Sequence, residues 1–171
     1  MSPPTPVNLT ELLEQSRKDV SDSIAGLSEP QAAAKPDPAR WSILECIEHI
    51  TAAEERFLGF LDQAGRAETP QVDPEKQARI SAAVLDRTQR AQAPAPVQPA
   101  SRFQTLAQAL EAFQAARSRS FRFAEERAAD LDILAAQHPR FGPVSAREFI
   151  FIIAGHARRH AAQIREIRAS L

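Results

Sequence analysis

Two histidines, His156 and His160, lie four residues apart near the C-terminus, and a third, His49, lies far earlier in the chain. Residues at positions i and i+4 of a helix project from one face, with their Cβ atoms about 5–6 Å apart. Two imidazoles at this spacing can bind one metal ion, as the histidines of the H-E-x-x-H motif do. A third histidine from a neighbouring helix would complete a site with open positions for water or substrate. We therefore predict a divalent metal site formed by His49, His156 and His160.

A structural role for the same three histidines is the main alternative. A single histidine on an apolar helix face is more often a core residue with hydrogen-bond partners than a metal ligand. A pair at this spacing is harder to explain in that way, because burying two imidazoles without partners costs free energy that a metal would remove. Three imidazoles suit zinc, nickel or iron, so the sequence leaves the identity of the metal open.

Two further residues on the helix of His49 are candidates for the site. Glu54 is predicted on the inward face, where it could orient a ligand imidazole, act as a base, or pair with an arginine of another helix. It lies about 140° around the helix from His49, so we expect it to accept a hydrogen bond from an imidazole of the last helix. Glu54 is our candidate catalytic residue. Cys46 could be a thiolate ligand, but a small buried apolar residue is the favoured interpretation.

The remaining polar residues near these motifs receive simpler interpretations. His138 precedes a proline in a predicted loop and is expected to be a surface or capping residue. Arg158 and Arg159 are expected to form a solvated face rather than an anion-binding clamp. No serine–histidine–aspartate or cysteine–histidine pattern indicates a competing nucleophile.

Four amphipathic helices are predicted to position the histidines. Capping boxes, in which a serine is followed three residues later by Glu or Gln, begin at Ser42, Ser101 and Ser145. The last helix carries His156 and His160 within its apolar stripe. The expected helix bounds are about 8–27, 42–64, 102–130 and 145–170.

The connections between these helices predict how the chain is folded. A possible short helix over 74–90 and an extended linker rich in proline and alanine over 91–100 separate the second long helix from the third. We predict an all-α, four-helix bundle of up-down-down-up topology, with this long crossover between helices 2 and 3. Helix 2 is then antiparallel to helix 4, and a rise of about 1.5 Å per residue places His49 opposite His160.

Composition narrows the class of protein. The chain has 171 residues, for which one domain over 1–171 is expected, and its 21 basic and 22 acidic residues give a net charge of −1. Such a balance argues against nucleic acid as a partner. One cysteine fits a reducing cytosol, so we expect a cytoplasmic protein. We expect no signal peptide and no membrane partner, because no apolar run approaches the ~20 residues of a membrane span.

Three segments of the chain resemble the DinB/YfiT-like family of four-helix-bundle proteins. They are RWSILECIEHITAAEERFL (40–58), HPRFGPVSAREF (138–149) and GHARRHAAQI (155–164). The resemblance implies that His49, His156 and His160 bind a divalent metal and that Glu54 matches the family's acidic residue. It also implies a homodimer and a metal-dependent enzyme for a small-molecule substrate, namely a hydrolase or a thiol S-transferase that uses a low-molecular-weight thiol. A non-catalytic binding or stress-associated protein with a structural metal is the alternative.

Overall fold

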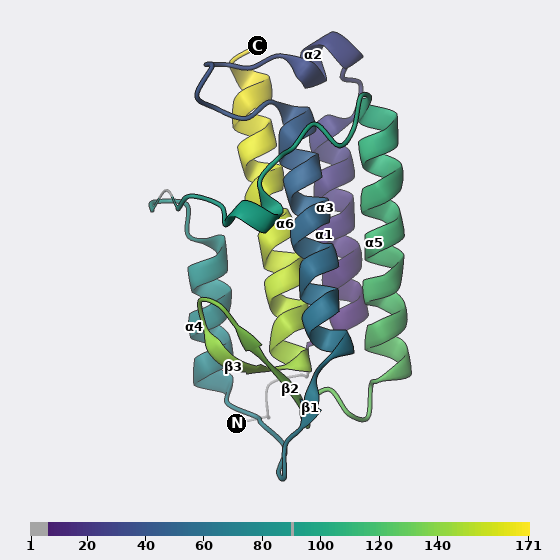
Figure 1. Cartoon of the computed structure of the whole chain (residues 1–171), viewed down its shortest axis with the longest axis vertical. Coiled ribbons are helices and arrows are strands. Elements are labelled where there is room, and N and C mark those ends of the chain that lie inside the picture. Colours follow the sequence, from purple (N-terminus) through teal and green to yellow (C-terminus); the bar gives the residue numbers. More distant parts are fainter. Residues whose placement is uncertain (1–6, 90) are drawn as a thin grey trace.

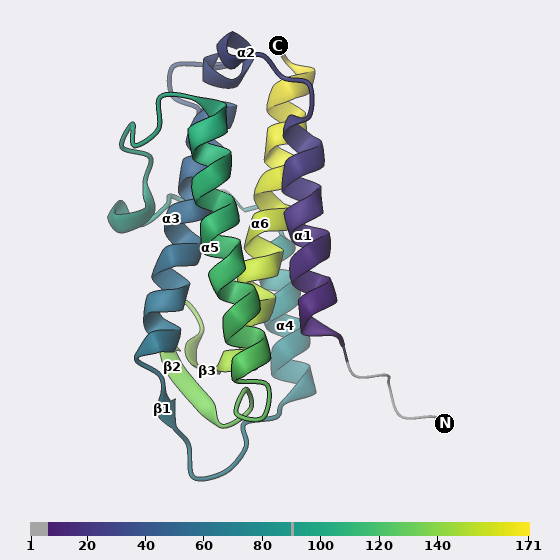
Figure 2. The same ribbon diagram turned by 90° about the vertical axis from the view of Figure 1, so that its right-hand side faces the viewer.

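Four long helices packed side by side form the body of the protein in a computed structural model, which describes residues 7–89 and 91–171. Both α3 and α5 run toward the end of the bundle that carries a small sheet, whereas α1 and α6 run away from it (Figure 1). Contacts link α6 to α1 and α3, and α5 to the same two helices (Figure 2). The helices α3 and α6 are thus antiparallel neighbours. Their bounds are α1 (Leu9–Ile24), α3 (Ile43–Asp62), α5 (Leu106–Glu126) and α6 (Ala146–Ala169).

Capping boxes begin α3 and α6 where the sequence predicts them. Ser42 caps α3 with Glu45 at the third helical position, and Ser145 caps α6 with Glu148. The prediction for α5 was wrong, because its capping box is formed by Thr105 and Gln108. Ser101 instead has a φ of 58°, a left-handed conformation that cannot belong to a helix N-cap.

Shorter helices lie between the long ones. The short helix α2 (Glu29–Ala33), with its own capping box, lies between the first two of the predicted long helices. The helix α4 (Pro74–Leu85) packs along α6 and ends before the predicted bound at residue 90, which lies outside the described residues. Gly155 permits this approach, because a Cβ atom there would lie 2.9 Å from the Val84 side chain. The chain therefore folds α4 against the helix that carries two of the histidines.

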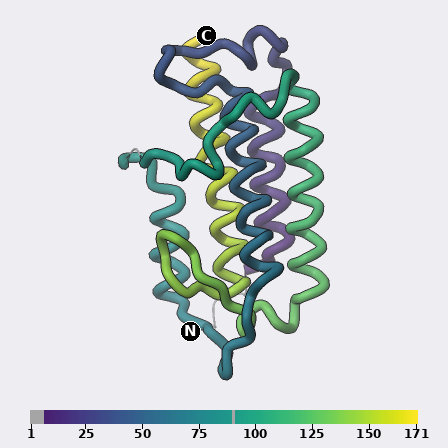
Figure 3. Tube along the Cα trace, viewed as in Figure 1, coloured from purple at the N-terminus to yellow at the C-terminus, as the bar shows by residue number. Residues whose placement is uncertain are grey.

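The long crossover returns the chain from the sheet end of the bundle to the opposite end (Figure 3). Its proline- and alanine-rich part is not simply extended, because a 3₁₀ turn, η1 (Ala95–Val97), forms within it. The Val97 side chain is buried. Both oxygens of Glu48, on α3, accept backbone N–H groups farther along the crossover, from Ala100 at 2.6 Å and Arg102 at 3.2 Å. This part of the crossover is thus anchored to α3 beside His49.

A three-stranded antiparallel sheet closes one end of the bundle and corrects the all-α prediction. Its strands are β1 (Gly65–Arg66), β2 (Leu134–His138) and β3 (Gly142–Ser145), in the order β1-β2-β3. The three residues 139–141 link β2 to β3, and Gly142 has a φ of +71° there. Strand pairing supplies hydrogen-bond partners to the backbone groups of the segment that covers this end of the core. Local sequence patterns do not predict this pairing.

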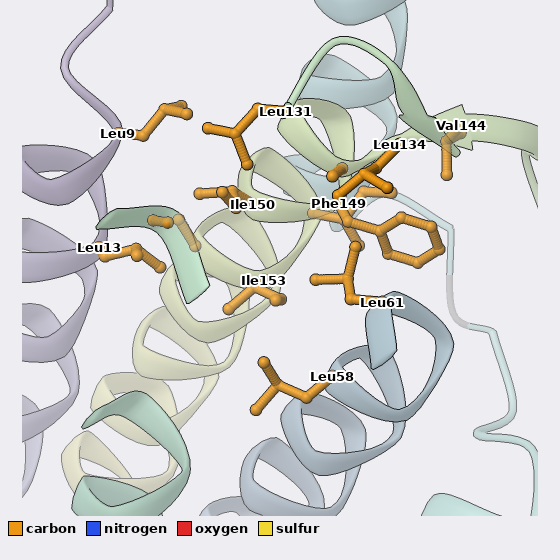
Figure 4. Packing of buried hydrophobic residues seen from close by; sticks show 14 of the residues in the cluster. Leu9, Leu13, Leu58, Leu61, Leu131, Leu134, Val144, Phe149, Ile150 and Ile153 are labelled. Carbon is orange, nitrogen blue, oxygen red and sulfur yellow. The ribbon is translucent and has the colours of Figure 1, made fainter. Parts of the chain in front are cut away.

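The core consists of two apolar clusters with polar side chains between them. The cluster near the sheet contains Leu58 of α3, Phe149 and Ile153 of α6, and Leu134 of β2 (Figure 4). The second cluster gathers apolar residues from the other half of the same helices. Within residues 7–89 and 91–171, no helix is both long and apolar enough to cross a membrane.

Candidate metal centre

His49 is held on α3 with one ring nitrogen already bonded to the backbone. Its side chain is buried, and its Nδ1 lies 2.7 Å from the carbonyl oxygen of Val97. A carbonyl only accepts hydrogen bonds, so Nδ1 carries the proton and Nε2 presents a lone pair. The Trp41 ring packs over the imidazole at a centroid distance of 4.8 Å. The crossover therefore selects the tautomer in which Nε2 of His49 is free to bind a cation.

The two histidines of α6 present their rings to His49. The centroids of His156 and His160 are 4.5 Å apart, as expected for one helical turn. Their distances from the His49 centroid are 4.9 Å and 4.6 Å. Nδ1 of His160 lies 2.8 Å from Oε1 of Gln163. This oxygen accepts a hydrogen bond from Nδ1–H, so Nε2 of His160 has a lone pair. Gln163 thus selects the tautomer of His160, as the Val97 carbonyl selects the tautomer of His49.

Ring nitrogens of the three histidines converge closely enough to bind one ion. One nitrogen from each ring can be chosen so that all lie within 4.8 Å of one another. The Nε2 atoms of His49 and His156 are 3.1 Å apart. Tetrahedral zinc with Zn–N bonds of about 2.0–2.1 Å would separate two ligand nitrogens by roughly 3.3–3.4 Å. The donor atoms and their spacing therefore fit a divalent metal ion.

The surroundings keep these histidines neutral, which is the form that binds a metal. Burial lowers the pKa of His49, and the nearby charge of Arg159 lowers it further, against the bond to Val97. Burial and the neighbouring imidazoles hold the pKa of His156 well below its usual value. For His160, burial is the main cause that lowers the pKa to about 3. Near neutral pH the three rings are therefore uncharged, and each has one nitrogen with a lone pair.

Glu54 does not make the contact predicted for it. Its two carboxylate oxygens accept hydrogen bonds from Nε and Nη2 of Arg117 at 2.8 and 2.9 Å. The hydroxyl of Ser120 donates to the same carboxylate at 2.7 Å. Arg117 is fully buried and also donates to the Leu13 carbonyl oxygen on α1. Glu54 bonds to α5 rather than to the imidazoles of α6, so the salt bridge that the sequence left open is the one formed.

Cys46 is a buried apolar residue, as favoured from the sequence. Its side chain is fully covered within the apolar cluster that also contains Ile43 and Ile47. Burial raises the pKa of the Cys46 thiol to about 12. A thiolate ligand at this position is therefore unfavourable.

His138 and the two arginines occupy three different settings. His138 caps the β2–β3 turn, because its Nδ1 accepts the N–H groups of Arg140 and Phe141. Arg158 donates to the Asp19 carboxylate at 3.1 Å, consistent with a solvated face. Arg159 instead donates to the carbonyl oxygens of Asp86 and Gln89, on the side of the histidines. The solvated face expected for both arginines is thus seen for Arg158, whereas Arg159 is held by backbone carbonyls.

Three contributors to the centre were missed from the sequence. Gln163 could have been found, since it follows His160 by three residues on the same helix. Trp41 carries no metal-binding atom, so its residue type does not point to a place beside the centre. The Val97 carbonyl is a backbone group in a proline-rich segment, and no residue type signals it.

Comparison with known proteins places this arrangement in a wider group. The sequence profile of the DinB superfamily matches residues 12–164. YuaE, an uncharacterized protein of Bacillus subtilis (strain 168), is 23% identical over 161 residues, which cover 94% of this chain and 97% of that protein. The solved structure of YfiT from Bacillus subtilis superposes with a TM-score of 0.54 at 15% identity, covering 98% of this chain and 91% of YfiT. YfiT is described as a probable metal-dependent hydrolase with an unusual four-helix bundle topology.

Proposed function

Because this chain belongs to the DinB superfamily, we propose that it is a metal-dependent hydrolase whose divalent ion is bound by His49, His156 and His160. The convergence of three neutral imidazoles from two antiparallel helices is the observation that carries the proposal. The description of YfiT as a probable metal-dependent hydrolase supports the same class of chemistry.

The protein's own groups prepare this centre. The Val97 carbonyl and Gln163 hold the outer nitrogens of two ligands, so their Nε2 atoms need no reorientation to bind an ion. The Trp41 ring covers His49 and also lies 6.3 Å from the His160 ring. Three neutral ligands leave a divalent ion its full charge, which lowers the pKa of a bound water or thiol toward neutrality.

Thiol S-transfer is the second candidate, and the position of Glu54 favours it. Among the described residues, the metal-binding cluster of three histidines includes no carboxylate, and Glu54 is engaged with Arg117. Water, with a pKa near 15.7, needs more activation than a thiol, whose ordinary pKa is about 8.5. A substrate thiol would therefore react without a neighbouring base.

Metal analysis of the purified protein tests the centre itself. We expect about one zinc, nickel or iron ion per chain in the wild type and loss of that ion in His160→Ala. Arg158→Gln is the matched control on the same helix, because Arg158 bonds to Asp19 on another face. Trp41 is the only tryptophan and the chain has no tyrosine, so its fluorescence should change on metal addition. Equal metal content in wild type and His160→Ala would refute the site.

Activity assays then separate the candidate functions. Activated esters or amides, tested without thiol, should be cleaved by the metal-loaded wild type if it is a hydrolase. Electrophiles offered together with a low-molecular-weight thiol should be consumed if it is a thiol transferase. Metal bound at full occupancy with no turnover in either assay would favour the non-catalytic alternative, a structural metal site.

A further inference from the structure

His138 carries a buried hydrogen-bond donor that has no described partner. Its Nδ1 accepts the backbone N–H groups of Arg140 at 3.1 Å and Phe141 at 3.3 Å. The proton of the neutral ring is therefore on Nε2. This nitrogen is buried and makes no hydrogen bond within residues 7–89 and 91–171. A buried N–H without a partner is unfavourable, and in native proteins it calls for an explanation such as a ligand.

The Phe57 ring lies between His138 and the histidine cluster. The ring of His138 packs against Phe57 at a centroid distance of 5.5 Å. Phe57 in turn meets His156 edge-on at 6.0 Å. Burial lowers the pKa of His138 to about 4, so the ring is neutral and keeps its Nε2–H near neutral pH. A group bound near His156 would thus be close to a donor on β2.

Positive charge gathers around the same place and is only partly offset by the carboxylate of Asp86. Arg159 donates only to main-chain carbonyls in the described contacts, and Arg140 lies over the Phe141 ring without an ion pair among the described residues. The pKa of Arg159 is lowered first by burial and then by the charges of Arg87 and Arg140. The charge of Arg159 also lowers the pKa values of His49, His156 and His160, and the charge of Arg140 lowers that of His138. Like charges this close repel one another, and an anion would relieve the repulsion.

We propose that an anionic group of the substrate, a carboxylate or a phosphate, binds beside the histidine cluster. One of its oxygens accepts the Nε2–H of His138, and its charge is balanced by Arg140 and Arg159. The proposal rests on the proposed function in one respect, namely that the reacting end of the substrate lies at the metal centre. The anion subsite is built from residues that are not metal ligands, so it can be tested in protein stripped of metal.

A titration of the metal-free protein with inorganic phosphate tests the subsite at constant ionic strength. The four histidines give a simple ring ¹⁵N spectrum, in which the His138 signals are those lost on substitution. We expect a saturable shift of the His138 Nε2–H signal. Arg159→Gln should weaken binding about tenfold or more, as expected for one charged hydrogen bond. Arg158→Gln, the neighbouring arginine paired with Asp19, should leave binding unchanged. Repeating the titration with acetate shows whether carboxylate or phosphate is preferred.

Two substitutions of His138 separate ligand binding from turn capping. Asn places its oxygen where Nδ1 accepts the turn amides but has no group at the position of Nε2. Gln places an N–H near the position of Nε2 but loses the turn acceptor. We expect His138→Asn to lose phosphate binding with little loss of stability, and His138→Gln to retain binding with lower stability.

The proposal is overturned if phosphate causes no saturable shift, or if Arg158→Gln weakens binding as much as Arg159→Gln. It is also overturned if His138→Asn binds phosphate like the wild type. Metal content, measured separately, shows whether the metal site itself has failed.

Discussion

At the residue scale, the outer nitrogens of the ligand imidazoles determine how ready the centre is for a metal. His160 Nδ1 is bonded to Gln163 on the same helix, one turn farther on. This contact takes the place of the one predicted for Glu54. Partners of this kind hold the ring orientation and the tautomer of a ligand.

Gln163→Leu should therefore weaken metal binding roughly 10–100-fold, the usual effect of losing such a partner. Gln163→Glu keeps an acceptor for the His160 proton and should bind metal at least as tightly as the wild type. Affinity can be followed by Trp41 fluorescence in competition with a chelator. Equal affinities for wild type and Gln163→Leu would show that Gln163 does not orient His160.

The buried thiol of Cys46 should make the stability of the fold depend on pH in alkaline solution. Its folded-state pKa is about 12, against 9.0 for an ordinary thiol. Between these values the native state keeps a proton that the unfolded state has lost, so the free energy of unfolding falls as the pH rises above about 9. The slope from this residue is about 1.4 kcal/mol per pH unit.

Urea unfolding of metal-free protein at pH 8 and pH 10 measures this slope. Cys46→Ala is the control, because it lacks the thiol and should lose less stability over the same interval. Identical pH dependences of the two proteins would show that Cys46 ionises as readily in the native state as in the unfolded chain.

At the element scale, a polar layer ties three helices together in the middle of the bundle. Arg117 of α5 bonds to Glu54 of α3 and to Ser16 of α1. On each of these helices the polar residues fall between the residues of the two apolar clusters. Such a layer can define how the helices align, because sliding one helix would leave buried charges unpaired.

Removing one member of this layer should be costly. Arg117→Met leaves the Glu54 carboxylate buried without its cation, so we expect a loss of about 3–5 kcal/mol in unfolding free energy. Replacing both residues, as in Glu54→Leu with Arg117→Met, should cost less than Arg117→Met alone. Urea unfolding measures both variants, and folded protein should retain its metal. Loss of metal in a stably folded Glu54→Gln variant would instead link Glu54 to the centre.

At the scale of the whole molecule, the homodimer implied by the family resemblance remains a prediction. The large apolar side chains that are most exposed, among them Val72 at 65% and Leu171 at 50%, come from separate segments. Isolated exposed residues of this kind are normal on a protein surface and do not mark an interface. Light scattering at micromolar concentration should give twice the chain mass of 18.8 kDa. A mass near that of one chain would contradict the dimer.

The sequence by itself determined the long helices and which residues could meet. Apolar residues at helical spacing and capping residues such as Ser42 and Ser145 are local signals, readable without a fold. The spacing of His156 and His160 is likewise a property of one helix. Rise per residue was then enough to place His49 opposite them once α3 and α6 were taken as antiparallel.

Only the tertiary structure decided the partners of the buried polar groups and the end of the bundle. Glu54 could have faced an imidazole or an arginine, and the packing of α5 against α3 brought Arg117 to it. The bond from His49 to Val97 joins residues 48 positions apart. The sheet pairs β1 with β2, whose residues Gly65 and Ala135 are far apart in the sequence. Such contacts depend on which elements become neighbours in space, and no pattern within a short stretch of sequence records that choice.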